Sequence, residues 1–597
     1  TNEFVDQIPV DEFLGDEKTM SESNTNRRDF LKYVGFSTAA ASLAACEGPV
    51  IKSVPYVVQP EQIIPGIANY YATAIADGFD FRSVIIKTRE GRPIKVENNK
   101  EAPTLGGGNA RVHASVLSMY DINRLQGPKA EGQDVDWSNF YGQVGAKLKA
   151  MAVSQKPVVL LTQTFASPTT QSIIDDFLVQ FPNVKHVVYD TLSASHALDA
   201  FENIYGVRAL ADYDFSKAKT IVSVGADILG DWQGGGYDSG YSQSRVPKKD
   251  HGNSEMSFHI QFESNMSLSG ANADHRIPTD PATQKKIVAQ IYAQLKGTSL
   301  NNDLNPQVQK AVAQTVARLK KSGSGAVVVS RIEDVAVQEV VLAINDHLGS
   351  EVIDTAQPRY IRQGSNKAVN QLVDDMESGK VKGLITAGVN PSFTLPNAEA
   401  FTAALSELEL TVAFATKEDE TAAASQYVAA IPHYLESWGD YEFKKGKYLL
   451  AQPTIRPLFD TQQFQDVLLK LSGSNSTYYQ KIKSNWSENI LNGSSWNQTL
   501  HDGFLSGNDS MEYDSVSFDV SRQIKTLSEA SSTSMSLVLY TKTGMGDGQQ
   551  ANNPWLQEFP DPISRVSWDN YLTVSASDAK NMGFKNVNVS DGGLNGS

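Results

Sequence analysis

Residues 220–227 read Thr220-Ile221-Val222-Ser223-Val224-Gly225-Ala226-Asp227, an apolar run that stops at a glycine. A short apolar run rich in β-branched residues is typical of a strand buried on both faces. Similar runs occur at 158–161, 326–330, 383–388 and 410–414. Apolar residues at helical spacing follow the first two of these. Strands that alternate with helices predict an α/β fold with parallel sheets covered on both faces.

Other stretches predict β-structure of a different kind. Residues 84–96 alternate in polarity and turn at Glu90-Gly91-Arg92, which predicts a β-hairpin. Residues 470–530 are rich in Ser, Asn and Gly, as in a linker or a surface loop. Residues 536–540 and 571–574 are strand-like, so we expect a mostly β domain near the end of the sequence. Because 586–589 also begins like a strand, we expect the polypeptide to continue beyond Ser597.

The composition excludes several functions. The chain has 597 residues, enough for about four domains of ordinary size. Its net charge of −16 argues against a nucleic-acid partner, because phosphate binding requires a basic surface. The chain has one cysteine, Cys46. A cluster held by four thiolates, a covalently attached haem c and an internal disulfide are therefore all excluded from this sequence.

Residues 26–46 have the features of an export signal. Asn26-Arg27-Arg28-Asp29-Phe30-Leu31-Lys32 resembles a twin-arginine signal in which Arg27 and Arg28 form the pair. The apolar run that follows, 33–45, is too short to cross a bilayer. It ends in Leu43-Ala44-Ala45-Cys46, a lipobox in which Cys46 is the candidate for lipidation. The alternatives are a basic cap on an amphipathic helix and a small buried thiol in an uncleaved helix.

Three glycine-rich loops could approach a phosphate or a pterin through backbone N–H groups. They lie at 225–236, 388–391 and 543–548. All three follow predicted strands, and ligands of open α/β sheets bind beyond the carboxyl ends of the strands. None matches a Walker loop or a G-x-G-x-x-G fingerprint, and a glycine after a strand is more often a simple turn.

The histidines offer no metal-binding spacing. His251, His259 and His275 share one neighbourhood, but the interpretation that we prefer is that they are surface or hydrogen-bonded histidines. The stretch 433–440, His-Tyr-Leu-Glu-Ser-Trp-Gly-Asp, could line a pocket through residues such as Glu436. No nucleophile–base pair is evident there, so we assign no catalytic residue.

Taken together, the motifs resemble the molybdopterin oxidoreductase superfamily from about residue 50 to the end. The stretches that carry the resemblance are Pro55–Val58, Ile94–Asn98, Ala110–Ser115, Tyr120–Leu125, Gly388–Pro391 and Trp555–Pro562. The twin-arginine start, Gln261–Asp274 and His433–Asp440 resemble more narrowly the molybdopterin-like B subunits of bacterial alternative complex III, which oxidises quinol.

The resemblance implies a multidomain fold with two Rossmann-like parallel-sheet domains, a small N-terminal β-rich domain and a C-terminal β-barrel-like domain. We accordingly divide the chain into 1–46 (signal and lipobox), 47–130 (β-rich, a degenerate iron–sulfur domain), 131–330 and 331–475 (Rossmann-like), 476–530 (linker or surface elaboration) and 531–597 (β-barrel-like, truncated).

The chain departs from the superfamily at the cofactor positions. The stretch expected to hold three cysteines reads Ala72–Phe81 without a thiol, and Asn109 stands where the fourth is expected. The region that matches the molybdenum ligand is Ser193–His196, in which Ser193 or Ser195 could in principle bind the metal. Electrons leaving such a metal would find no nearby cluster. We therefore expect no cofactor and no metal in this segment and regard its cleft as vestigial, with the residues Gly225, Gly234, Gly235, Asn390 and Ser195.

The resemblance also implies a setting for the chain. We expect a structural, non-catalytic part of a membrane-bound quinol:electron-acceptor oxidoreductase in a respiratory chain, on the periplasmic side of the bacterial inner membrane. Its implied partners are polytopic quinol-oxidising subunits, an iron–sulfur domain that carries the clusters, multihaem cytochrome c subunits and a terminal oxidase. The alternatives are an active molybdenum–bis-pterin enzyme with a serine ligand, such as a polysulfide or sulfoxide reductase, and an exported binding protein that uses the old cleft.

Overall fold

The structure is a computed structural model. It describes residues 66–102, 104–246, 256–298, 300–301, 303–513, 516, 518–532 and 535–585, and the backbone of 589–591 and 594–596. The predicted export signal with Arg27, Arg28 and Cys46, the motif 55–58 and His251 lie outside the described residues. Within those residues, no helix combines the length and the apolar character that crossing a bilayer requires.

A small antiparallel sheet contains β1 (Asn69–Ala76), β2 (Phe81–Arg89) and β3 (Arg92–Asn98) in the order β1-β2-β3. The predicted hairpin is confirmed, because β2 pairs with β3 around Glu90 and Gly91, both of which have positive φ. The short helices α4 (Ala110–Ala114) and η2 (Ser115–Tyr120) follow the sheet. Ile75, Val84 and Val96 of the strands share a core with Val112, Val116 and Met119.

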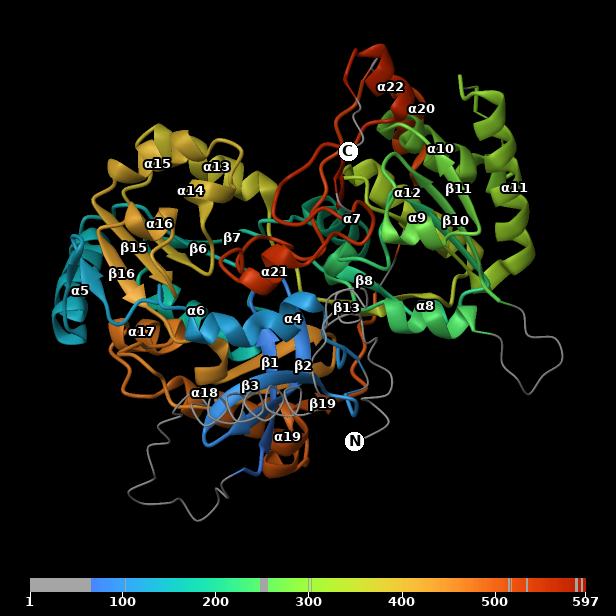
Figure 1. Ribbon diagram of the computed structural model, residues 1–597. Helices are drawn as coiled ribbons and strands as arrows, with labels where there is room; N and C mark the ends of the chain where they lie inside the picture. Colours follow the sequence, from blue (N-terminus) through green and yellow to red (C-terminus); the bar gives the residue numbers. More distant parts are fainter. Residues whose placement is uncertain are drawn as a thin grey trace, which may run out of the picture. The chain divides into compact units, whose positions relative to one another are not determined.

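The largest sheet has seven strands in the order β5-β4-β16-β15-β14-β6-β7. Its parallel strands are β6 (Val158–Thr162), β7 (Val184–Val188), β14 (Gly383–Ala387), β15 (Leu410–Ala415) and β16 (Tyr427–Ala430), and β4 (Lys129–Ala130) and β5 (Gln133–Asp134) extend one edge. One face packs on α5 (Trp137–Val153), α6 (Pro168–Gln180) and α17 (Phe464–Leu471), and the other on α13 (Asn366–Glu377) and α15 (Ala398–Ser406) (Figure 1).

The second parallel sheet has the order β11-β10-β9-β12. Its strands are β9 (Thr220–Val224), β10 (Phe258–Glu263), β11 (His275–Pro278) and β12 (Ala326–Ser330). Val222 and Val224 share a core with α10 (Pro281–Leu295), α11 (Pro306–Ser322) and α12 (Val335–Leu348), and Ile221 shares one with α7 (Ser195–Tyr205) and α8 (Asp238–Arg245). The prediction of parallel sheets covered on both faces is thus confirmed.

A five-stranded sheet with antiparallel pairs, β19-β18-β17-β13-β8, connects distant stretches of the chain. Its strands are β8 (Leu210–Tyr213), β13 (Ile353–Arg359), β17 (Gly439–Lys444), β18 (Lys447–Ala451) and β19 (Phe504–Ser506). The remaining short elements are η3 (Phe215–Lys217), η4 (Trp232–Gly234), α9 (Leu268–Asn272), η5 (Gly323–Gly325), α14 (Pro391–Thr394), α16 (Glu420–Ala423), η6 (Tyr434–Glu436), η7 (Trp486–Ile490), α19 (Trp496–Asp502), α22 (Ala576–Asn581), β20 (Val589–Asp591) and β21 (Leu594–Gly596).

The parallel sheets are not built from consecutive stretches of chain. β6 pairs with β14, across the expected boundary at 330/331, and the whole β9–β12 sheet is inserted between β7 and β14. Local patterns mark each strand, but they do not say which strands pair when more than a hundred residues separate them.

Two predictions for the C-terminal part of the chain are wrong: the linker or surface loop within 476–530, and the strands near the end of the sequence. Within 476–530, α18 (Tyr478–Asn485) and η7 pack into the core of the seven-stranded sheet, where Trp486 is fully buried, so this half is not a linker. Residues 536–540 and 571–574 form no strand, and the described part of 531–585 contains only the helices α21 (Pro554–Glu558) and α22. No β-barrel is therefore present in this described stretch.

Candidate functional site

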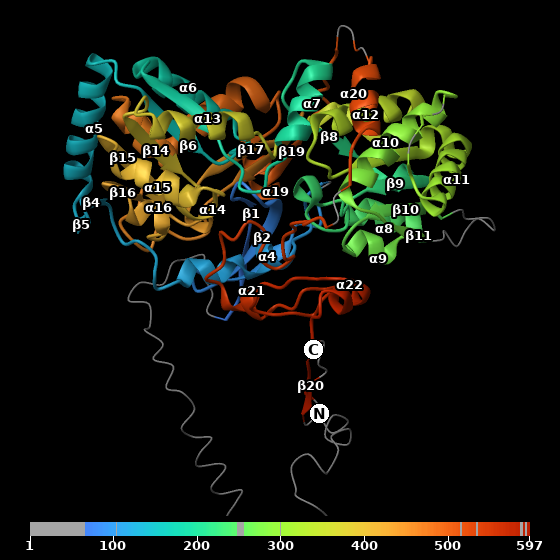
Figure 2. The same cartoon turned by 90° about the horizontal axis from the view of Figure 1, so that it is seen from above.

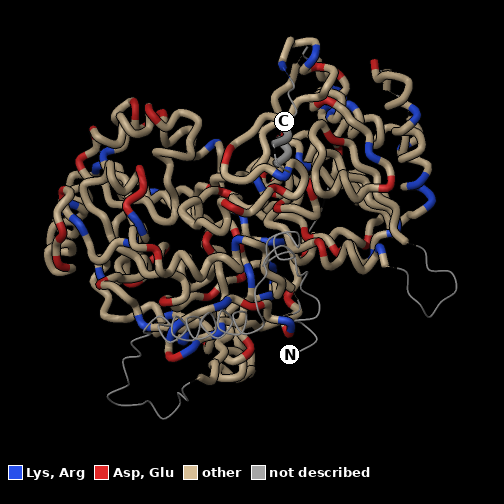
Figure 3. The backbone as a smooth tube through the Cα atoms, viewed as in Figure 1, with Lys and Arg blue, Asp and Glu red and all other residues tan. Residues whose placement is uncertain are grey.

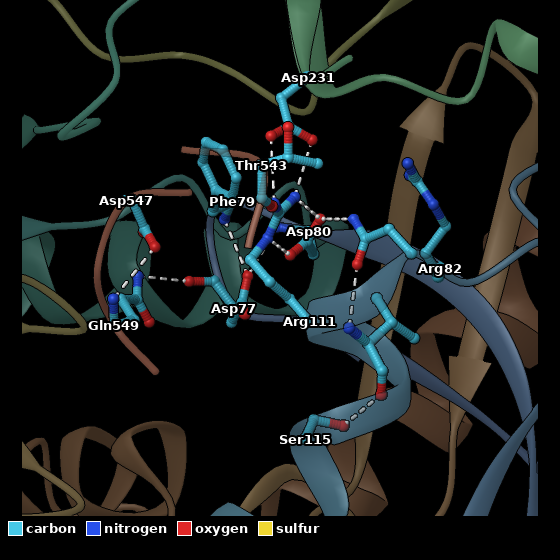
Figure 4. Close-up of polar contacts among 12 residues, drawn as sticks. Asp77, Phe79, Asp80, Arg82, Arg111, Ser115, Asp231, Thr543, Asp547 and Gln549 are labelled. Atoms are coloured by element: carbon cyan, nitrogen blue, oxygen red, sulfur yellow. Dashed lines mark hydrogen bonds and ion pairs between the residues drawn. The ribbon is translucent and has the colours of Figure 1, made fainter. Parts of the chain in front are cut away.

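The guanidinium of Arg111 lies at the centre of a buried polar network (Figure 4). Its Nε and Nη2 donate to the two carboxylate oxygens of Asp80 at 2.8 and 2.9 Å, and Nη2 also donates to Asp231 Oδ1 at 2.8 Å. Nη1 donates to Asp231 Oδ2 at 3.1 Å and to the carbonyl of Thr543. Burial disfavours the charged guanidinium, but the two carboxylates outweigh this effect and raise the pKa of Arg111. One side chain therefore joins the β1–β2 turn, the loop after β9 and the C-terminal segment.

Asn109 occupies the position at which the superfamily resemblance expects the fourth cysteine. Its Nδ2 donates to Asp80 Oδ1 at 2.7 Å, and its Oδ1 accepts from the N–H of Val112 at 2.9 Å as the N-cap of α4. Burial raises the pKa of Asp80, but Arg111 and Asn109 outweigh this effect and the pKa is lowered. The two stretches that would have to enclose a cluster are thus joined directly by hydrogen bonds. Asp, Asn and Arg side chains in mutual contact do not fit an iron–sulfur cluster, which is held by thiolates.

The loop 543–549 closes over this network. The guanidinium groups of Arg111 and Arg362 both contact the ring of Phe79, each 4.9 Å from its centroid. Gly546 has a φ of +54°, and a Cβ there would come within 2.6 Å of Phe79 and 2.9 Å of Arg111 Nε. Gln549 Nε2 donates to the carbonyl of Asp77 at 2.9 Å. The third predicted glycine loop therefore approaches this chain's own side chains closely.

Two carboxyl groups beside the network have raised pKa values. Burial, with the carboxylates of Asp80 and Asp547 nearby, raises the pKa of Asp77 to about 7. Burial also raises the pKa of Asp547 to about 6, with Asp80 acting in the same direction. Asp547 lines a cleft of about 240 Å³, a volume that includes space open to solvent. The other lining residues are Gly78, Phe79, Gln163, Tyr189, Asp190, Thr191, Leu192, Arg362, Gly388, Val389 and Gln549.

The loop 225–236 presents carbonyl groups to arginine side chains. Arg82 Nη2 donates to the carbonyl of Gly234 at 3.2 Å, and Arg359 Nη1 donates to that of Gly235 at 3.0 Å. A Cβ at Gly234, whose φ is +83°, would lie 2.3 Å from Ile361. Gly225 turns the chain after β9 with a φ of +76°. These glycines therefore allow close packing within the chain.

The remaining candidate cleft residues are engaged in contacts between elements. The N–H of Asn366 donates to Ser195 Oγ at 3.2 Å, at the start of α13, and Ser195 is 2% exposed. Ser193 Oγ accepts from the N–H of Ser195 at 2.9 Å. Asn390 Nδ2 donates to Glu420 Oε2 at 2.6 Å, and its Oδ1 accepts from Thr421 Oγ1 at 2.8 Å. Neither serine lines the cleft beside Asp547.

The pocket-like stretch 433–440 is largely buried, and its polar groups bond to groups of this chain. Arg124 Nη2 lies 2.5 Å from Glu436 Oε2, an ion pair that unites two of the motifs carrying the resemblance. His433 accepts from the N–H of Leu435 at 3.3 Å, and burial, assisted by Arg124, lowers its pKa to about 3. Burial likewise lowers the pKa of His259, to about 4. Within the described residues, no group of three or more His, Cys, Asp or Glu side chains could hold a metal ion.

Sequence reasoning identified Asn109 but missed Asp80, Arg111, Asp231 and Arg362 as a group. Asp80 lies within Ala72–Phe81, and Arg111 lies two residues after Asn109. The signal that could have identified them is a charged residue close to each position where a cysteine is missing. No local pattern brings Asp231 or Thr543 to Arg111, because they lie 120 and 432 residues away in sequence.

The comparisons with known proteins agree with this architecture. No protein-family model matches the chain. The chain is 23% identical over 504 residues to the "Menaquinone reductase, molybdopterin-binding-like subunit" of Nitratidesulfovibrio vulgaris, with coverage of 75% of this chain and 72% of the relative. Among solved structures it is similar to the acetylene hydratase of Pelobacter acetylenicus, with a TM-score of 0.59, 11% identity and coverage of 74% of each chain. The resemblance to the molybdopterin oxidoreductase superfamily is therefore confirmed at the level of the fold.

Proposed function

We propose that this chain is a scaffold subunit of a respiratory quinone oxidoreductase complex and holds no redox cofactor between residues 66 and 585. The observation that carries the proposal is the direct contact of Asn109 and Arg111 with Asp80. These bonds lie where the resemblance expects a cluster, and they join directly the two stretches that would have to enclose it. The name of the menaquinone reductase relative supports the quinone part of the proposal.

The more specific proposal is a B subunit of alternative complex III on the periplasmic side of the membrane. Polytopic quinol-oxidising subunits, a cluster-bearing iron–sulfur domain and multihaem cytochrome c subunits would carry the electrons. Lys and Arg residues are interspersed with Asp and Glu residues along the drawn backbone (Figure 3).

The alternative of a molybdenum enzyme with a serine ligand is disfavoured by the use of that serine. Ser195 Oγ accepts a hydrogen bond from the backbone N–H of Asn366 at the start of α13, so this hydroxyl has a structural role. Losing such a bond costs about 0.5–1.5 kcal/mol, whereas losing a metal ligand removes most turnover.

The test is purification of the native complex with metal and pterin analysis of each subunit. We expect no molybdenum, no pterin and no cluster iron in this chain, and quinone-dependent activity near the wild-type level in Ser195→Ala. Thr526→Ala, an exposed hydroxyl on α20 (Ser521–Ser528), is the matched control. Stoichiometric molybdenum that disappears in Ser195→Ala, together with a roughly hundredfold loss of activity, or about 2.7 kcal/mol of barrier, would establish the molybdenum enzyme instead.

A further inference from the structure

The third glycine-rich loop places an acidic residue between two glycines. Gly546 and Gly548 flank Asp547 and have φ values of +54° and +85°. Downstream, Asn553 Nδ2 donates to the carbonyl of Ala114 at 2.8 Å, and Figures 1 and 2 both place α21, which begins at the next residue, beside α4. Glycine backbones change their dihedral angles at little cost, and hinges are often small residues in loops. A loop of this composition beside a fixed anchor has the features of a hinge.

Side-chain hydrogen bonds hold residues 543–549 against the buried network. Arg111 Nη1 donates to the carbonyl of Thr543, and Gln549 Nε2 donates to the carbonyl of Asp77 at 2.9 Å. Two N–H groups of the loop donate to carbonyls of its own turns, at 3.0 and 2.9 Å. Among the described residues, no strand or helix includes a residue of this loop. The loop can therefore leave the network without breaking the pairing of any sheet.

Closure of the loop brings the carboxyl of Asp547 near Asp77 and Asp80 of the β1–β2 turn (Figure 4). Asp80 is paired with the guanidinium of Arg111. Asp77 instead accepts from two backbone N–H groups of its own turn, at 3.0 and 2.7 Å, and Asp547 accepts from the N–H of Gln549 at 3.2 Å. Because these donors carry no full charge and neighbouring carboxylates repel one another, the closed loop disfavours ionisation of Asp77 and Asp547.

The charges around the closed loop balance only when these two carboxyls are protonated. The charged groups are the carboxyls of Asp77, Asp80, Asp190, Asp231 and Asp547 and the guanidinium groups of Arg82, Arg111 and Arg362, and the hydroxyls of Tyr434 and Tyr441 also face Asp77. With every carboxyl ionised, five negative charges face three positive charges. Protonation of Asp77 and Asp547 leaves three of each, so it removes the excess of negative charge that would push the loop outward.

We propose that residues 543–549 form a pH-operated latch over the cleft that Asp547 lines. The latch is closed while Asp77 and Asp547 hold their protons, and it opens when they ionise. Each proton is released to water, and the carboxylate of Asp547 becomes hydrated in the open loop. The inference goes beyond the proposed function, because it holds whether or not the chain belongs to a quinone oxidoreductase complex.

The pH range of the change follows from the two carboxyls. Burial, with neighbouring carboxylates, raises the pKa of Asp547 to about 6 and that of Asp77 to about 7. The closed loop is therefore favoured below these values and loses this advantage as the pH rises through them. If opening returns the pKa of Asp547 to 3.8, the ratio of open to closed loop should rise about tenfold between about pH 5 and about pH 8.

Hydrogen–deuterium exchange of the complete chain, analysed by mass spectrometry, measures this ratio, because local opening exposes backbone N–H groups to exchange. After correction for the chemical exchange rate, peptides that cover residues 541–549 should lose protection about tenfold between about pH 5 and about pH 8. The hairpin turn at 89–92 is the internal control and should show no such change.

Three variants assign the change to the loop. Asp547→Asn should keep the loop closed at the higher pH, because its amide cannot ionise. Asp569→Asn, at an exposed carboxyl of the same segment, is the matched control and should behave like the wild type. Gln549→Ala should open the loop at both pH values, because it loses the hydrogen bond to the carbonyl of Asp77.

Two outcomes would overturn the inference. One is a wild-type loop whose protection does not depend on pH, and the other is a pH dependence that persists in Asp547→Asn. Peptides of β9 report whether the whole fold survives at the higher pH. Loss of protection there in parallel with the loop would assign the change to global unfolding and would also contradict a latch. If Asp547→Asn does not fold, Asp77→Asn provides the same comparison.

Discussion

At the scale of single residues, Arg111 makes the contacts that connect the candidate site. It is 2% exposed and binds two carboxylates and one carbonyl from different parts of the chain. A buried ion pair is weak evidence for stability when it is compared with an apolar replacement, but removing one partner leaves an uncompensated buried charge. The arrangement therefore predicts a large effect for removal of the guanidinium.

Replacing Arg111 with Met should destabilise the protein by about 3–5 kcal/mol, because Asp80 would lose its paired cation in a buried setting. Denaturant unfolding of the variant measures this loss. Lys95→Met, which breaks the exposed pair with Glu97, should change stability by no more than about 1 kcal/mol. Equal small losses in both variants would show that the network does not hold the fold together.

The raised pKa values of Asp77 and Asp547 predict a pH dependence with a definite sign. For a carboxyl whose pKa is 3.8 when unfolded and about 7 when folded, the folded state binds the extra proton. The stability contribution is therefore fully present below about pH 4 and is lost as the pH rises through about 7. Asp547, at about 6, adds to the same trend over a slightly lower range.

Asp77→Asn should remove much of this loss, because the amide cannot ionise. Its side-chain oxygen can still accept from the N–H groups of Phe79 and Asp80. Melting curves at about pH 5.5 and about pH 8 should show a smaller decrease for the variant than for the wild type. Glu101→Gln, at an exposed carboxylate, should behave like the wild type, and an undiminished decrease in Asp77→Asn would contradict the assignment.

At the scale of elements, Asp440 attaches the stretch 478–490 to the core. This fully buried carboxyl accepts from Ser167 and Thr169 at 2.7 and 2.6 Å and from Trp486 Nε1 at 2.9 Å. Burial raises its pKa, although the hydrogen bonds act in the opposite direction. Tyr478 Oη also donates to Asp440 Oδ1 at 3.4 Å. A segment whose composition is rich in Ser and Asn is therefore anchored to the core by Trp486 and Tyr478.

Truncating this anchor should separate packing from hydrogen bonding. Trp486→Ala should cost about 3–5 kcal/mol, because it opens a cavity in a fully buried site. Trp486→Phe should cost less, about 1.5–3 kcal/mol if the lost bond is to an ionised carboxylate. Trp555→Ala, at a 54%-exposed tryptophan, should stay within about 0.5 kcal/mol of wild type. Thermal unfolding of the three variants measures the order. Equal costs for the two substitutions at Trp486 would refute the role of packing, and a negligible cost for Trp486→Phe would refute the role of the hydrogen bond.

At the scale of the whole molecule, long-range pairs unite the family-like motifs. Arg124 and Glu436 lie 312 residues apart in sequence and form a buried ion pair. β6 and β14 pair across an inserted four-stranded sheet. Residues of the motifs that carry the resemblance therefore stabilise the fold through contacts between distant parts of the chain.

Export of the whole molecule is predicted from the signal at residues 26–46, which lies outside the described residues. Replacing Arg27 and Arg28 together with Lys should leave the protein in the cytoplasm, because the twin-arginine pathway recognises the pair. Cell fractionation followed by immunoblotting measures the location. Lys52→Arg serves as a control substitution that preserves charge beyond the pair. Normal periplasmic recovery of the double variant would show that export does not depend on these residues.

Part of the candidate site was predictable from single positions. The loss of thiols at Ala72–Phe81 and Asn109 is a property of the sequence alone. The network around Arg111 was not predictable, because Asp231 and Thr543 reach Arg111 only through the path of the folded chain. The strand-like stretches 536–540 and 571–574 show that a local pattern can also predict an element that the fold does not contain. Their local pattern favours β-structure, but a strand exists only when a neighbour satisfies its backbone.

The sequence by itself determined the α/β class, the hairpin at residues 84–96 and the absence of cluster ligands. Each of these follows from local periodicity, from turn chemistry or from which atoms are present. Only the tertiary structure decided the order of the strands, the burial of Trp486 and the direct contacts of Asn109 and Arg111 with Asp80. The physical reason is that these features depend on contacts between residues far apart in sequence, whose free energy comes from shared burial and charge pairing that no local pattern records.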